Sequence, residues 1–167
     1  MSYTLEALSK DCRDALMAEN NEAGRAKVRD FIAKACADEG FVTSHLGPEA
    51  DKEREILYED PDLGFCIIAH VYKGPKSSNP HDHGPSWAIY GQAAGETEMT
   101  DWKVLKRPEN GEAGMVEPAR TYRLTPGDAY LYNVGDVHSP AREDTTRLLR
   151  VEGVNMMTVK REPYKAA

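Results

Sequence analysis

Residues 74–95 read GPKSSNPHDHGPSWAIYGQAAG and residues 127–138 read GDAYLYNVGDVH. The first stretch contains a His-x-His pair, His81 and His83. On an extended chain, residues i and i+2 point to the same side, so these two imidazoles project together, as two ligands of one metal ion require. His138 ends the second stretch, where a strand and a glycine turn precede the next extended segment. The pattern therefore predicts a metal site with His81, His83 and His138 as its ligands.

The remaining histidines of the chain are His45 and His70. His45 is expected in a surface loop. His70 alternates with Ile68 and Tyr72 on an expected strand, and it is either an ordinary core histidine or a residue that supports the metal ligands. A His-x-His pair alone is a weak indication of a metal, because core histidines also occur in this pattern.

Short apolar runs separated by Gly and Pro surround the two stretches. They predict strands at residues 65–72, 87–92, 98–105, 120–124, 129–133 and 147–154. Many short strands at this spacing are typical of a sandwich or a barrel. No alternation of strands and helices suggests a parallel sheet.

The first forty residues have a different pattern. Leu5, Leu8, Cys12 and Leu16 recur at helical spacing, and a second helix follows and ends near Gly40. A connecting loop is expected over residues 41–54. We therefore divide a single domain into a helical segment (1–45), a metal-binding barrel (46–159) and a loose C-terminal tail (160–167).

Composition narrows the classes of function. The chain has 167 residues, with 21 Lys and Arg against 28 Asp and Glu, and a net charge of −7. This balance disfavours nucleic-acid binding. No apolar run is long enough for a membrane span, and the first residues lack the apolar core of a signal peptide. Three widely spaced cysteines predict no disulfide framework and favour a reducing cytoplasm.

The two stretches resemble the paired motifs of the cupin superfamily. Gly74 lies one place early, whereas the histidine pair and Gly95 fit the first motif. Gly127, Gly135 and His138 fit the second, with Asn133 in its proline slot. The resemblance covers about residues 56–155. It implies a mainly β fold, a double-stranded β-helix (jelly-roll) barrel with the metal inside and two N-terminal α-helices packed outside.

Ala88, or Trp87 with a shorter gap, fills the slot of the family's glutamate ligand. A site with three histidines is typical of the cysteine dioxygenase (thiol dioxygenase) branch, which the chain also resembles around residues 65–83 and 96–102. The branch's substrate-binding arginine is replaced here by acidic residues after Tyr58. Its cross-linking cysteine falls at about Ala88. Its Ser-His-Tyr triad falls near Leu148, Arg150 and Glu152. The resemblance thus favours the metal site and does not extend to cysteine as the substrate.

Three neutral imidazoles and a divalent ion carry a formal charge of about +2, which favours an anionic substrate. The open positions of such a site suit Fe(II) and dioxygen. The Irving–Williams order allows Ni, Cu or Zn in the purified protein.

Strand alternation suggests further site residues. Tyr90 and Gln92 share a face with Ala88, and Tyr90 either bonds the substrate or packs the barrel. Arg150 and Glu152 share a face of the last strand. They are either a buried pair in which Arg150 binds the substrate, or a solvent-facing pair on an edge strand.

The favoured function is an Fe(II) dioxygenase that acts on a small anionic metabolite, for example a thiol. The alternatives are a non-oxidative metal enzyme (an isomerase, lyase or hydrolase) and a metal-dependent ligand-binding module. The resemblance leaves the oligomeric state open between a homodimer, since cupins often dimerise, and a monomer, which is also found among thiol dioxygenases.

Overall fold

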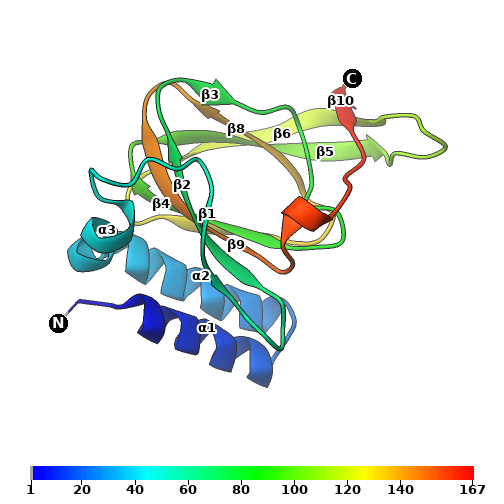
Figure 1. Cartoon of the computed structure of the whole chain (residues 1–167). Helices are drawn as coiled ribbons and strands as arrows, with labels where there is room; N and C mark the ends of the chain where they lie inside the picture. Colours follow the sequence, from blue (N-terminus) through cyan, green and yellow to red (C-terminus); the bar gives the residue numbers. More distant parts are fainter. Residues whose placement is uncertain (1) are drawn as a thin grey trace.

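The computed structural model describes residues 2–167, and its chain begins with helices that pack on the outer face of one of two sheets (Figure 1). The helices are α1 (Leu5–Ala18), α2 (Glu22–Ala37) and α3 (Glu39–Leu46). Each begins at a polar side chain that accepts a hydrogen bond from a backbone N–H of the first turn; these caps are Thr4, Asn21 and Asp38. Such caps satisfy amides that have no partner within the helix.

Within the described residues, three helices precede the strands where two were expected. The third, α3, includes residues that were predicted to lie in a loop over residues 41–54. The Asp38 carboxylate accepts a hydrogen bond of 2.8 Å from the Phe41 N–H and starts a new helix one residue after α2 ends. Gly40, which was expected to end the second helix, lies in the first turn of α3. A glycine at this position resembles a C-terminal cap, so the sequence pattern concealed the new helix.

The strands form two five-stranded sheets. Sheet A has the order β1-β2-β9-β4-β7 and sheet B the order β10-β6-β5-β8-β3. The bounds are β1 (Glu55–Glu59), β2 (Cys66–Tyr72), β3 (Lys76–Ser77), β4 (Ala88–Ala94), β5 (Thr97–Lys106), β6 (Gly114–Leu124), β7 (Ala129–Tyr132), β8 (Val137–Arg142), β9 (Thr146–Glu152) and β10 (Tyr164–Ala166). A short 3-10 helix, η1 (Met156–Thr158), follows β9. Every pairing is antiparallel except that of β10 with β6. The expected mainly β fold, with its strands in two sheets, is confirmed.

Alternation gives sheet A two faces with different partners. Ile67, Ile89 and Leu149 point outward and belong to the large apolar cluster that includes α1, α2 and α3. Ala88 and Tyr90 point inward and pack with Met99 of sheet B. The helices therefore seal the outer face of sheet A, and the inner face is left to line the space between the sheets.

Two further differences concern the last strands. The tail 160–167 was expected to be loose, but Tyr164–Ala166 pairs with β6, and the Tyr164 hydroxyl donates to Asp82 Oδ2 over 3.0 Å. The edge-strand alternative for Arg150 and Glu152 is wrong, because β9 lies between β2 and β4 in the middle of sheet A. Both corrections depend on strand pairings between residues far apart in the sequence.

Within residues 2–167, no helix has the length and apolar character that crossing a membrane requires.

Candidate metal centre

Backbone pairing brings the two histidine stretches together. The His81 N–H donates to the His138 carbonyl over 3.0 Å, and the His138 N–H donates to the His81 carbonyl over 2.9 Å. His138 is also the second residue of β8, which pairs with β5 in sheet B. His83 follows two residues after His81, so the strand register places all three imidazoles at one end of the interior.

The three imidazoles converge. One ring nitrogen from each of His81, His83 and His138 lies within 4.8 Å of the others. The Nε2 atoms of His83 and His138 are 3.1 Å apart, and the three rings meet edge to face with centroids 4.8–5.5 Å apart. The predicted ligands therefore form a cluster that could hold a metal ion.

Burial keeps these imidazoles neutral. His83 and His138 are 3% and 0% exposed. Loss of solvation lowers the pKa of His81 to about 4, and it lowers the pKa of His83 and His138 well below the usual value of 6.5. A neutral imidazole has a free lone pair at pH 7, which metal binding requires.

The tautomers fit a cation. His81 Nδ1 lies 2.8 Å from the Asn79 carbonyl oxygen, so it carries the proton and leaves Nε2 free. The Nε2 atoms of His83 and His138 face each other across 3.1 Å, where they either share one N–H···N hydrogen bond or bind a cation between them. Nitrogens that bond one ion at about 2.0–2.1 Å, with an angle near 100° at the ion, have this separation. The donor set therefore suits a divalent transition metal.

Tyr90 and Arg150 lie beside this cluster. The Tyr90 hydroxyl is 3.2 Å from His83 Nε2, and the Arg150 guanidinium stacks over the Tyr90 ring, with Cζ 4.4 Å from its centroid. Arg150 also pairs with Glu152 across 3.5 Å, and the Glu152 side chain is 1% exposed. A second arginine, Arg54 from the segment before β1, lies 3.4 Å from both carboxylate oxygens of Glu152. The tertiary structure thus places the Arg150–Glu152 pair in the interior.

Gln92 lies farther along the same inner face and contacts none of the three histidines through a hydrogen bond. Its Oε1 accepts a hydrogen bond of 2.9 Å from Thr97, and its Nε2 donates to the Ala94 carbonyl. Thr97 accepts in turn from Arg142 Nε over 3.1 Å. Gln92 therefore belongs to a chain of hydrogen bonds that ends at a buried arginine.

A cavity of about 570 Å³ opens beside His81 and Tyr90. Four cationic side chains and one carboxylate line it: Lys76, Arg142, Arg150, Arg161 and Glu162. Sequence reasoning missed Arg142, although a signal exists. Arg142 lies four residues after His138 on the same strand, and alternation puts both on one face.

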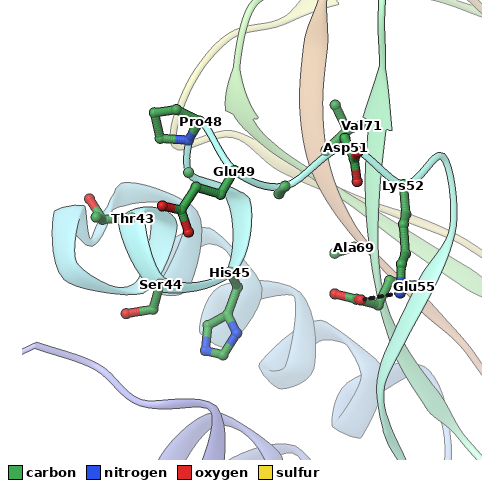
Figure 2. Close-up of a pocket in the computed structure, with 12 residues that line it drawn as sticks. Thr43, Ser44, His45, Pro48, Glu49, Asp51, Lys52, Glu55, Ala69 and Val71 are labelled. Carbon is green, nitrogen blue, oxygen red and sulfur yellow. Dashed lines mark ion pairs between the residues drawn. The ribbon is translucent and has the colours of Figure 1, made fainter.

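The other two histidines lie apart from the cluster. His70 is on the inner face of sheet A, where its Nδ1 is 3.1 Å from the Tyr72 hydroxyl and its Nε2 has no hydrogen-bond partner among residues 2–167. His45 projects from α3 beside a cavity of about 490 Å³ on the outside of the barrel (Figure 2). That cavity contains an exposed ion pair between Lys52 and Glu55, with an N–O distance of 3.2 Å.

Tyrosines complete the opposite wall of the cluster. The Tyr132 ring lies 4.1 Å from the His138 ring, centroid to centroid, and its hydroxyl is 2.6 Å from that of Tyr122. Tyr122 donates to Asp101 over 2.9 Å. Burial and the neighbouring Tyr122 raise the pKa of Tyr132 well above the usual value, so this wall stays uncharged.

No model of a protein family matches the sequence, and no curated protein matches it. Solved structures do resemble the chain. A cupin superfamily protein from Desulfitobacterium hafniense is 14% identical, with 64% of this chain and 84% of that one covered and a TM-score of 0.46. KdgF from a Halomonas species is 16% identical, with 64% and 83% covered and a TM-score of 0.46. The Cnp3 cupin domain of Schizosaccharomyces pombe is 11% identical, with 66% and 68% covered and a TM-score of 0.48. Identities and TM-scores this low say nothing about the activity of this chain. Its fold is defined by its own strand order.

Proposed function

We propose that this protein is a metal-dependent cupin enzyme, and specifically an Fe(II) dioxygenase that acts on a small anionic substrate such as a thiol. The observation that carries the proposal is the convergence of three neutral imidazoles beside a cavity rich in arginine. Their lone pairs would hold the metal through His81, His83 and His138. Bound Fe(II) would supply the activation of dioxygen that protein side chains cannot perform.

The chain's own residues would bind and orient the substrate. Arg150 would attract the anionic group toward the histidines, and Glu152 holds that guanidinium in place from the buried side. Burial raises the pKa of Tyr90, so its hydroxyl stays protonated at pH 7 and can donate a hydrogen bond next to His83. Tyr132 and Tyr90 also exclude water from the histidines.

Metal analysis tests the site itself. The purified protein is expected to bind one divalent ion per chain, and His81→Ala should lose it. His45→Ala is the matched control, because His45 lies on α3 outside the barrel. Full metal content in His81→Ala would contradict the proposed ligand set.

Oxygen consumption tests the reaction. Protein reconstituted with Fe(II) is mixed with a panel of thiols, diketones and aromatic diols in an oxygen electrode. We expect uptake that depends on one class of these compounds and is lost in His81→Ala. The absence of uptake with every compound would reject the dioxygenase, and turnover without uptake would point to a non-oxidative metal enzyme.

A further inference from the structure

Arg142 is a buried charge without a counter-charge. Its residue is 5% exposed, and no carboxylate of residues 2–167 forms an ion pair with it. One of its Nη atoms is buried and has no hydrogen-bond partner in that range. An uncompensated charge is costly to bury, and burial lowers the pKa of Arg142 accordingly. Such a group calls for an anion that is not part of the chain.

The guanidinium is held in place before any ligand arrives. Its Nε donates to Thr97, which Gln92 holds in turn, and its Cζ lies 4.7 Å from the centroid of the Tyr72 ring. A fixed, stacked guanidinium presents its remaining N–H groups as a planar fork that suits a carboxylate or a phosphate. The free Nη atom of Arg142 belongs to such a fork.

The same cavity has a second cationic end near the histidines. Arg150 lies over the Tyr90 ring, and the Tyr90 hydroxyl is close to His83. His138 and Arg142 are four residues apart on β8, which separates their Cα atoms by about 13 Å. The histidine end and the Arg142 end are therefore two separate positions in one cavity.

The other charges of the cavity do not neutralise Arg142. Lys76 pairs with Glu53 across 3.2 Å, and Arg161 donates to the Asp82 carbonyl. Glu162, the one carboxylate of the lining, is exposed and pairs with neither buried arginine. An excess of positive charge thus remains at both the histidine end and the Arg142 end of the cavity.

We propose that this cavity binds a small molecule with two separate anionic groups, one at the histidine end and one paired with Arg142. The inference rests on the proposed function for the position of the first group, next to the metal ligands. The burial and the contacts of Arg142 are independent of whether a metal is bound.

Calorimetry at low salt tests the proposal on metal-stripped and zinc-loaded protein. The probes are succinate and glutarate, with butyrate as the singly charged control and inorganic phosphate as a compact anion. A dicarboxylate is expected to bind at least tenfold more tightly than butyrate. Arg142→Gln should abolish this preference while it leaves the zinc content unchanged. Arg123→Gln, at an exposed arginine of β6, should keep both.

Several outcomes would overturn the proposal. They are equal affinity for succinate, glutarate and butyrate in the unaltered protein, tight binding of phosphate alone, and an unchanged preference in Arg142→Gln. If Arg142→Gln does not fold, the same titrations are made with Arg142→Lys. Lysine keeps the charge but loses the Nε contact to Thr97, so the affinity for the dicarboxylates should fall severalfold. An unchanged affinity would count against the role of Arg142. A dicarboxylate preference in protein that binds no zinc would uphold this inference and reject the proposed function.

Discussion

Acidification of the metal-free protein should unfold it over a narrow pH range, because four histidines, three of them buried and His81 half-buried, are neutral in the folded state. Loss of solvation lowers the pKa of His70, His81, His83 and His138. In the unfolded chain each returns to a pKa of about 6.5. Below this pH the unfolded state binds more protons, so the free energy of unfolding falls as the pH falls.

The magnitude follows from the pKa values. The shift for His81, from 6.5 to about 4, corresponds to about 3 kcal/mol. Each of the four histidines adds about 1.4 kcal/mol per pH unit wherever only the unfolded chain binds its proton, so the steepest slope is about 5 kcal/mol per pH unit. A domain of this size has a total stability of about 5–15 kcal/mol. The stability is therefore fully present above about pH 7.5 and is mostly lost between about pH 6.5 and 5.

Urea denaturation followed by circular dichroism measures this slope. The protein is unfolded at pH 7.5, 6.5 and 5.5 in the presence of a chelator, and the urea midpoint should drop at each step. His70→Gln should reduce the slope by about a quarter, because it removes one of the four groups. Excess zinc should move the loss of stability to lower pH, since the metal binds only neutral imidazoles. Equal urea midpoints at pH 7.5 and 5.5 in chelator would refute the reasoning.

Three substitutions test how the barrel and helices hold the site. Gly91→Ala should cost about 1–3 kcal/mol in urea unfolding, because its Cβ would lie 2.5 Å from Ile32 Cγ2 and 2.8 Å from Cys36 Sγ of α2; an unchanged midpoint would show that α2 adjusts freely. Glu152→Gln should cost about 3–5 kcal/mol, since it leaves two largely buried guanidinium groups without their shared carboxylate. A loss under 1 kcal/mol in chemical denaturation would mean that the pair is effectively solvated. Asp38→Ala should cost about 0.5–2 kcal/mol by removing the cap of α3, and full stability in a thermal melt would argue against that cap.

Local patterns predicted much of the barrel. Glycine and proline turns and apolar runs located β2, β4, β5, β7 and β9 to within a few residues. They predicted no strand at β1, β3 or β10; the last of these, β10, has three residues at the end of a polar tail and no periodicity of its own. Its place comes from pairing with β6 and from the Tyr164 hydroxyl bond to Asp82. The edge-strand alternative for Arg150 failed for the same reason, because sheet order depends on long-range pairing.

The candidate metal centre likewise combines features that local sequence patterns predict with features that depend on long-range pairing. The sequence by itself determined which residues could bind a metal, because the His-x-His spacing and the glycine turn before His138 are local features. Only the tertiary structure decided what surrounds them. Arg142 became a buried and unpaired charge through its place between β3 and β5, and Gln92 became its support through Thr97. Burial and the absence of a counter-charge are properties of the assembled barrel, since they depend on which side chains the other strands bring near and no single segment encodes them.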